Sequence, residues 1–247
     1  MHRLLVETDL LLSDAPALPK EARDHLRVVR PKAGEEIELF DGQGRWRTFA
    51  VRRPDGSSAS ALAPVSGVRT SARPRGSLTL FACVTKGSRW DWTIEKATEL
   101  GVTRLVPVIS DRTIVRLASG EGVAKRVRWQ RIAEEAARQS DAKWLPEILA
   151  PVSFADSLPL VRATTCFVGA LADPPPEPVG AALARLAEGV ADVAVYVGPE
   201  GDFTPQELSA LQEVATPVSF GSTVLRAETA AIYGISALKT FLDVRAC

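Results

Sequence analysis

The last two-thirds of the chain alternate short apolar runs with segments of helical periodicity, and this alternation constrains the fold more than any other feature. Apolar strands separated by helices predict a mostly parallel sheet with helices on both faces, an α/β fold. We expect strands at residues 78–84, 102–109, 164–171, 193–197 and 217–220, and helices at 91–100, 123–139, 178–188, from 205 onward and at 227–242. Because open α/β sheets bind ligands at the carboxyl ends of their strands, the loops at those ends are the candidate functional segments.

Two of the predicted helices have boundary signals. Asp91 can accept hydrogen bonds from first-turn amides, and Gly101 stands where a left-handed residue commonly ends a helix. Residues 204–207 (Thr-Pro-Gln-Glu) form a capping box with proline at the first helical position. We therefore expect Asp91 to cap one helix and Pro205 to begin another.

The first 70 residues read instead as a small β domain. Residues 36–40 and 45–51 alternate polar and apolar side chains, and Asp41-Gly42 between them indicates a hairpin. Short strands at close spacing predict a barrel-like fold. The other elements expected in this part are a helix at 20–29, a turn at Asp55-Gly56 and a strand at 58–65.

Residues 66–76 are poor in apolar side chains and rich in Ser, Gly, Arg and Thr, which is typical of a linker. We therefore expect one domain at 1–70 and a second at 76–247. No apolar run approaches the ~18 residues that would suggest a membrane span. The N-terminus becomes acidic at Glu7, too early for a secretory signal, so we expect a cytoplasmic protein with no membrane partner.

Charge and cysteine content limit the classes of function. Basic side chains outnumber acidic ones by 25 to 18 in residues 1–145, whereas residues 146–247 have 5 basic and 12 acidic side chains. A basic front half is typical of proteins that contact phosphates, although an arginine-rich solvated surface has the same signature. The three cysteines (Cys83, Cys166 and Cys247) are far apart and only two histidines exist, so we predict neither a disulfide framework nor a metal site.

The first candidate loop is the Gly-Pro-Glu-Gly segment at 198–201. Its glycines permit close approach of the backbone to a ligand. Its exposed N–H and C=O groups can then read the edge of a purine base without a charged side chain. A tight strand-to-helix turn is the alternative explanation for the same four residues.

The second candidate loop, at 224–230, follows the last predicted strand and opens the last helix. Arg226 places a fixed cation at the ligand edge of the sheet. Glu228 stands in the first helical turn, where a carboxylate is favourable by itself. If the two loops lie side by side, they form one pocket. Neither a G-x-G-x-x-G nor a G-x-x-x-x-G-K-[ST] phosphate loop is present, so the pocket is not a usual dinucleotide or nucleoside-triphosphate site.

The last predicted helix has small side chains at helical spacing along one face. This spacing lets another backbone approach closely and indicates tight packing, either within the fold or across a dimer interface. The residues on this face are Ala227, Ala230, Ala231, Gly234 and Ala237.

Several separate motifs, in order, resemble the SPOUT class of RNA methyltransferases. Within that class, the chain is similar to the bacterial family that methylates N3 of a uridine in small-subunit (16S) ribosomal RNA. The motifs are residues 25–30, Gly34 and 39–42, then 86–87, 94–102, 129–133, 139–140 and 146–148, and finally 198–201 and 224–230. The resemblance implies a C-terminal α/β domain tied in a trefoil knot and a small N-terminal barrel of the PUA-like type.

The sequence departs from this family at one place. The family usually has Gly-Arg directly after the Gln-Ser pair, and this chain has Asp141-Ala142 there. A cation expected near the RNA is therefore absent, and an acid is present. Lys143 is close enough in sequence to compensate, as a weaker point-charge partner.

The resemblance also implies a cofactor, S-adenosylmethionine, and no metal. Methyl transfer to a uracil nitrogen needs orientation and stabilisation of the uracil anion, and Arg226 is the expected source of that charge. Glu228 would either accept the proton or hold Arg226, and we prefer the second role. By resemblance, the cofactor-binding residues are Leu171, Gly198, Pro199, Glu200, Gly201, Phe220, Gly221, Val224, Leu225, Arg226 and Thr229.

The expected partner is 16S ribosomal RNA or the small ribosomal subunit, bound by a homodimer with the last helix at its interface. Phosphate contacts would position the enzyme, and the target base would be flipped into the pocket. The residues expected to bind RNA are Arg3, Arg27, Arg30, Arg45, Arg47, Lys86, Arg89, Gln139 and Lys143.

Two other functions remain open from the sequence. A related knotted methyltransferase could act on a ribose 2′-oxygen or on transfer RNA. A ribosome-assembly factor could bind RNA without activity, which the intact cofactor loops disfavour and the Asp141-Ala142 departure permits.

Overall fold

The computed structural model describes residues 1–52, 61–116, 118, 120–161, 165–172 and 174–246. The turn predicted at Asp55-Gly56, the start of the strand predicted at 58–65, and Cys247 lie outside these residues. The chain forms two compact units. The first contains Met1–Arg73 and Ala137–Leu145, and the second contains Pro74–Ala136 and Pro146–Cys247.

The first unit is built on a five-stranded sheet in which β1-β2-β3-β4 follow one another and β5 pairs with β3. The predicted hairpin is confirmed: β2 and β3 pair antiparallel, with Ile37 opposite Phe49. The predicted helix at 20–29 is confirmed as α2, whereas the predicted linker contains β5. The elements are β1 (His2–Leu5), α1 (Thr8–Leu12), α2 (Lys20–Val29), β2 (Glu36–Phe40), β3 (Arg45–Arg52), β4 (Ala61–Pro64) and β5 (Arg69–Thr70).

Residues 137–145 belong to the first unit because a buried charged cluster holds them there. Arg3 Nε lies 2.7 Å from Glu38 Oε1, and its guanidinium donates to the carbonyl oxygens of Ala137 (2.7 Å) and Ala142 (3.1 Å). Lys143 Nζ donates to the same Glu38 oxygen at 2.7 Å. The Arg3 and Glu38 side chains are only 6% and 5% exposed, so both charges depend on these partners.

We expect Arg3→Ala to lower the free energy of unfolding by about 3 kcal/mol, at the lower end of the range for breaking a buried ion pair, because Lys143 still pairs with Glu38. Urea unfolding of the two variants measures this. The control is Arg27→Ala, since the Arg27 side chain is 78% exposed in a surface ion pair and should change stability by less than about 1 kcal/mol. An unchanged urea midpoint for Arg3→Ala would show that the cluster does not hold this segment.

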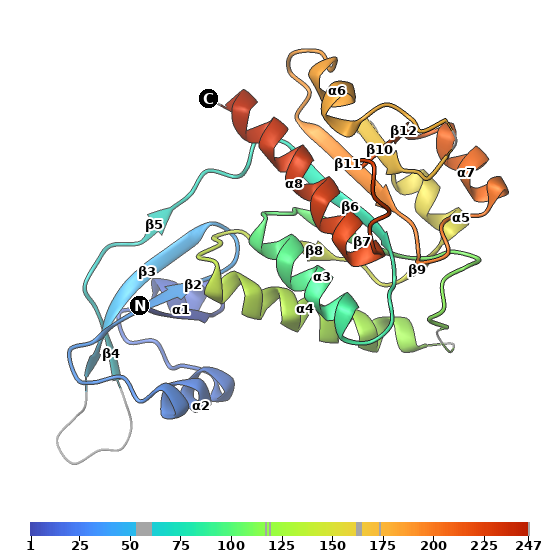
Figure 1. Cartoon of the computed structure of the whole chain (residues 1–247). Helices are drawn as coiled ribbons and strands as arrows, with labels where there is room; N and C mark the ends of the chain where they lie inside the picture. The colour runs from blue at the N-terminus through green and yellow to red at the C-terminus, as the bar shows by residue number, and fades with distance from the viewer. Residues whose placement is uncertain (53–60, 117, 119, 162–164, 173, 247) are drawn as a thin grey trace. The chain divides into compact units, whose positions relative to one another are not determined.

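The second unit contains a seven-stranded parallel sheet among the described residues. Its order is β12-β10-β11-β6-β7-β8, and β9 also pairs with β7. The strands are β6 (Ser77–Cys83), β7 (Arg104–Ile109), β8 (Glu147–Ile148), β9 (Val152–Ser153), β10 (Thr165–Gly169), β11 (Asp192–Val197) and β12 (Thr216–Val218). The predicted parallel sheet is therefore confirmed, with β8 and β9 as short additions at one edge (Figure 1).

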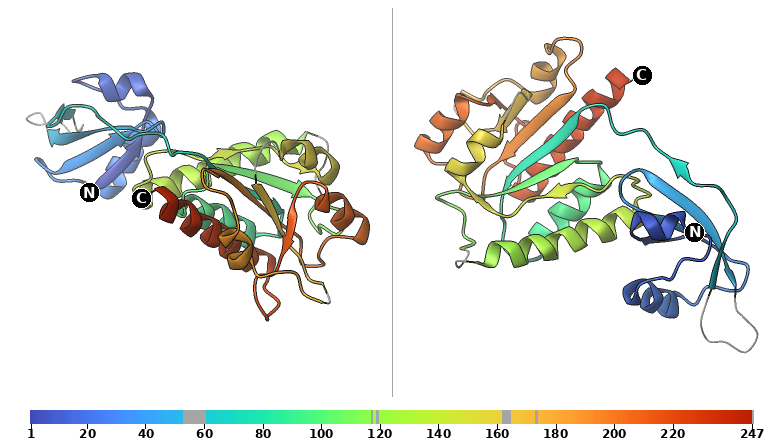
Figure 2. Two further views of the ribbon diagram at one scale, coloured as in Figure 1. Left: turned by 90° about the horizontal axis from the view of Figure 1, so that it is seen from above. Right: turned by 180° about the vertical axis from the view of Figure 1, so that it is seen from behind.

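Alternate residues of each strand point to opposite sides of this sheet, so both of its faces carry apolar side chains. Helices cover both faces (Figure 2). Leu78 and Leu80 of β6 pack in a core with residues of α3, α4, α6 and α8, whereas Phe81 packs in a second core with residues of α5 and α7. The helices are α3 (Ser88–Glu99), α4 (Glu121–Gln139), α5 (Phe154–Ser157), the 3-10 turn η1 (Leu158–Leu160), α6 (Val179–Ala184), α7 (Pro205–Gln212) and α8 (Ala227–Ala246).

The helix boundaries agree only partly with the sequence signals. The capping box is confirmed at α7: Thr204 Oγ1 accepts from the Glu207 amide at 3.2 Å, and Glu207 accepts from the Thr204 amide at 2.9 Å. Asp91 is not the cap of α3, which begins at Ser88; Asp91 lies in the first turn and pairs with Arg128. Among the described residues, no helix has the length and apolar character needed to cross a bilayer.

Candidate functional site

The neighbouring strands β12, β10 and β11 end at the same edge of the sheet, and the loops after them line one cavity. Its volume is about 270 Å³, close to the lower end of the range for small-molecule sites. The structure therefore brings together the two loops that the sequence singled out. The lining residues are Gly169, Ala170, Leu171, Val197, Gly198, Pro199, Glu200, Asp202, Ser219, Phe220, Gly221, Thr223, Val224, Leu225, Arg226, Ala227 and Ala230.

Most of the expected cofactor-binding residues lie on this cavity, with two exceptions. Gly201 and Thr229 are absent from the lining. The Gly201 carbonyl instead accepts a hydrogen bond from Arg112, and Thr229 is an exposed residue of α8. Gly169 and Ala170, at the end of β10, also line the cavity and were not among the expected residues.

The loop at 198–203 has a defined backbone conformation. The Asp202 amide donates to the Pro199 carbonyl at 2.9 Å, and Asp202 has a left-handed φ of 58°. The Asp202 carboxylate accepts from the Phe203 amide at 2.8 Å. Arg89 of α3 pairs with Glu200 at 3.2 Å, so the one carboxylate of the Gly-Pro-Glu-Gly segment already has a cationic partner.

Phe220 forms an apolar wall of the cavity, and two glycines make room for its ring. A Cβ atom on Gly169 would lie 2.4 Å from Phe220 Cε2, and one on Gly234 would lie 3.2 Å from Phe220 Cζ. The Phe220 ring also contacts Tyr233, with ring centroids 5.4 Å apart. At Gly234, the small-residue face predicted for the last helix thus serves packing within the fold.

Arg226 and Glu228 flank the start of α8. Arg226 is exposed at the cavity, and its guanidinium has no hydrogen bond or ion pair to any part of the chain that the structure describes. Glu228 is half-buried, and its Oε2 atom is buried without a hydrogen-bond partner among the residues that the structure describes. No ion pair joins the two side chains within the described residues, in contrast to the preferred expectation that Glu228 holds Arg226. Arg226 is therefore available to a ligand in the cavity, whereas Glu228 lies outside its lining.

The residues expected to bind RNA divide into two groups by exposure. Arg3 and Lys143 are held in the buried cluster around Glu38, and Arg47 is 12% exposed and donates to the Ser66 carbonyl. These three are therefore engaged within the first unit, which argues against their expected contacts with RNA, and Lys143 pairs with Glu38 and Asp141. The remaining residues are exposed at the surface: Arg27, Arg30, Arg45, Lys86, Arg89 and Gln139.

Two cysteines of the second unit, Cys83 and Cys166, are buried and unpaired. Burial raises the pKa of the Cys83 thiol to about 12, and burial likewise raises the pKa of Cys166 to about 12, so both remain protonated and unreactive near neutral pH. In the residues that the structure describes, no group of three or more His, Cys, Asp or Glu side chains is arranged to hold a metal ion.

Comparison with known proteins identifies the chain as an RNA methyltransferase. The model of the RNA methyltransferase domain family matches residues 72–239. The ribosomal RNA small subunit methyltransferase E of Synechocystis is 30% identical over 98% of this chain and 78% of its own length. The protein of the same name from Bacillus subtilis is 31% identical over 96% of each chain.

A solved structure of a protein with the same name is similar to nearly the whole chain. The small subunit methyltransferase E of Neisseria gonorrhoeae, bound to S-adenosyl methionine, has 29% identity, covers 97% of each chain and superposes with a TM-score of 0.83. This chain belongs to the ribosomal RNA small subunit methyltransferase E family. The expected fold class is confirmed: a SPOUT-type α/β domain with a small N-terminal β domain.

Proposed function

We propose that this protein transfers the methyl group of S-adenosylmethionine to N3 of one uridine in 16S ribosomal RNA, and that it acts in the cytoplasm as a homodimer. The observation that carries the proposal is the three-loop cavity at the carboxyl edge of the parallel sheet, lined in part by Arg226, whose guanidinium has no hydrogen bond or ion pair among the described residues. Support comes from the solved structure of the Neisseria gonorrhoeae relative, which covers 97% of this chain and is bound to S-adenosyl methionine.

The residues present fit this cofactor. The cavity is lined mainly by glycine, alanine and other apolar side chains, and backbone N–H and C=O groups can approach an adenine edge there. Phe220, Leu171 and Val224 offer apolar surface. When bound, S-adenosylmethionine supplies an electrophilic methyl group on a sulfonium centre.

Arg226 and Glu228 would act on the uracil. N3 of uracil carries a proton at neutral pH and becomes a nucleophile only when that proton leaves. A guanidinium beside the uracil oxygens stabilises the resulting anion, which is the role we assign to Arg226. Since Glu228 has no ion pair with Arg226 in the described part of the chain and has a buried oxygen without a donor, we assign it the acceptance of the N3 proton.

The exposed cations of both units would hold the RNA backbone. Arg27, Arg30 and Arg45 lie on the surface of the first unit, and Lys86 and Arg89 lie on the surface of the second. Phosphate contacts of this kind give affinity that falls with salt concentration. Arg3 and Lys143, whose side chains are held by Glu38, are left out of this set.

The proposal is tested with small subunits, and separately with 16S ribosomal RNA, from cells that lack this protein. Each is incubated with the purified protein and isotopically labelled S-adenosylmethionine, and the product is mapped by nuclease digestion and mass spectrometry. We expect label on N3 of a single uridine. Label on a ribose oxygen would refute the N3 assignment, and cofactor binding without any label on either RNA would contradict the proposed substrate. If the protein neither labels RNA nor binds the cofactor, an inactive assembly factor would be favoured.

A further inference from the structure

The loop after β7 forms a compact turn beside the Gly-Pro-Glu-Gly segment. The Thr113 amide donates to the Ser110 carbonyl at 3.1 Å, and the Ser110 amide donates to Thr113 Oγ1 at 3.0 Å. Ser110 and Thr113 are 2% and 1% exposed, so the turn is anchored in the interior of the second unit. Arg112, between them, is exposed and extends from a fixed base.

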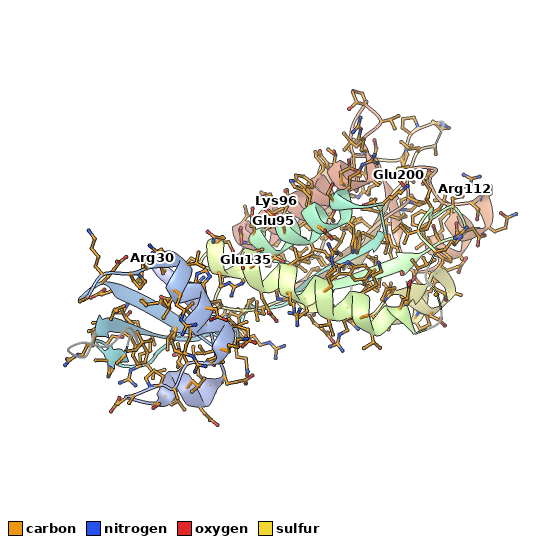
Figure 3. All side chains as sticks on the ribbon, turned by 90° about the horizontal axis from the view of Figure 1, so that it is seen from below. Arg30, Glu95, Lys96, Arg112, Glu135 and Glu200 are labelled. Carbon is orange, nitrogen blue, oxygen red and sulfur yellow. The ribbon has the colours of Figure 1, made fainter. Side chains whose placement is uncertain are left out.

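This turn is attached to the cavity loop and to α7 at two points. Arg112 Nη1 donates to the Gly201 carbonyl at 2.8 Å and reaches the Phe203 carbonyl at 3.4 Å. Figure 3 labels Arg112 and, from the cavity loop, Glu200. The neighbouring Asp111 amide donates to Glu207 Oε1 at 2.9 Å. Glu207 is 5% exposed and caps α7 with its other oxygen.

From these contacts we propose that Arg112 is a positioning residue for cofactor binding, which sets the backbone of the loop at 198–203. The carbonyl oxygens of Gly201 and Phe203 are engaged by the guanidinium, so both peptide groups are fixed in orientation. The intervening Asp202 has a left-handed conformation that side chains with a Cβ atom disfavour. Arg112 therefore stabilises a backbone that the loop would otherwise adopt only part of the time.

The consequence is preorganisation of one wall of the cavity. Gly198, Pro199, Glu200 and Asp202 line the cavity, and all belong to the segment that Arg112 holds. Without the guanidinium, binding of the cofactor must also order the loop. The apparent affinity for the cofactor is then the intrinsic affinity multiplied by the fraction of molecules in which the loop is already ordered. Once the cofactor is bound the loop is ordered in either case, so the effect belongs to KM for the cofactor rather than to kcat.

The experiment compares Arg112→Met with Arg116→Met in the full chain. Methionine keeps most of the stem that packs against Gly201, whose Cα substituent would lie 3.5 Å from Arg112 Cδ, and removes the donors. Arg116 is an exposed arginine of the same loop that donates to the Asp111 carbonyl, and in the described part of the chain it makes no hydrogen bond or ion pair with 198–203. Titration calorimetry with S-adenosylmethionine gives the affinities, and hydrogen exchange of the 198–203 amides reports the order of the loop.

We expect Arg112→Met to weaken binding of S-adenosylmethionine by about tenfold or more, as for loss of a charged hydrogen-bond donor, with faster amide exchange at 198–203 and a similar kcat at saturation. Arg116→Met should bind like the wild type. Arg112→Lys, which retains the charge and one donor direction, should recover part of the affinity and provides the test if the methionine variant folds poorly. Wild-type affinity in both Arg112 variants would overturn the proposal.

The inference rests on the proposed function, since it takes the cavity as the site of S-adenosylmethionine. The two fail differently. If the wild-type protein does not bind S-adenosylmethionine, the proposed function falls and the inference falls with it. If the wild type binds and Arg112→Met binds equally well, only the positioning role of Arg112 is refuted.

Discussion

Arg226→Ala is expected to reduce kcat for RNA methylation by about a hundredfold to a thousandfold, the usual effect of removing a preorganised charge that stabilises an anionic transition state. The guanidinium has no hydrogen bond or ion pair among the described residues, so its removal breaks none of these and should leave the fold unchanged. Single-turnover methyl transfer with saturating S-adenosylmethionine measures the chemical step. Cofactor titration on the same variant separates this step from binding.

Two further variants sharpen the test of Arg226. Arg226→Lys keeps a cation but loses the planar donor fork, so its rate should lie between those of the alanine variant and the wild type. Arg185→Ala removes an exposed arginine that pairs with Glu177 outside the cavity, and it should methylate at the wild-type rate. Near-normal turnover of Arg226→Ala would refute the catalytic assignment.

The architecture of the second unit follows from features that are local in sequence. Apolar runs identified the central strands β6, β7, β10 and β11, and the capping box placed the start of α7 correctly. Short elements gave no such signal. Strands β8 and β9 have two residues each, so too few positions alternate for a pattern to emerge.

The first helix of the second unit shows how a local signal can mislead. Asp91 has the side chain of a good cap, but the helix begins three residues earlier, after Gly87. Asp91 is then in the first turn, where it pairs with Arg128 of α4. That partner lies 37 residues away in the chain, and single-sequence reasoning contains no information on such a contact.

The site was predictable where it depended on loops and not where it depended on pairing across the chain. Glycines and strand ends identified two loops of the cavity, but the contacts of Arg112 with 201–203 span 89 and 91 residues. The same limit explains Arg3 and Lys143. Both are ordinary surface cations by composition, and only the fold reveals that they share the buried carboxylate of Glu38.

The sequence departure at Asp141 also acquires a structural explanation. Asp141 has a left-handed φ of 60°, a conformation that the family's usual glycine adopts without strain. In this chain its carboxylate lies 3.2 Å from Arg3 Nε and 2.8 Å from Lys143 Nζ. The Asp141 side chain is 71% exposed, so these ion pairs should contribute little to stability.

Gly169→Ala should impair both stability and cofactor binding, because the added methyl group has no space. Its carbon would lie 2.4 Å from Phe220 Cε2 and 2.9 Å from Cζ, closer than real Cβ contacts permit. Gly169 does not have a positive φ, so the effect is steric rather than conformational. The Phe220 ring also packs close to Gly234 and against Tyr233, whose ring centroid lies 5.4 Å away, so it cannot move toward α8 without disturbing that packing.

The expected cost of this overpacking is about 1–3 kcal/mol in the free energy of unfolding. Phe220 lines the cavity, so its displacement should also weaken S-adenosylmethionine binding by about tenfold, the equivalent of about 1.4 kcal/mol. Urea unfolding and titration calorimetry measure the two effects. Gly180→Ala is the matched control, because Gly180 lies in α6 with no atom near its Cβ position and an ordinary φ, and alanine there should be neutral or slightly stabilising.

A double variant distinguishes the steric explanation from any other. Phe220→Leu shortens the side chain that the new methyl group would meet, so Gly169→Ala should cost less in that background than in the wild type. Additive losses of stability in the double variant would show that Gly169 and Phe220 do not interact. If Gly169→Ala alone retained wild-type stability and affinity, the ring would have to move without cost, and the close packing of Phe220 could not be what shapes this wall of the cavity.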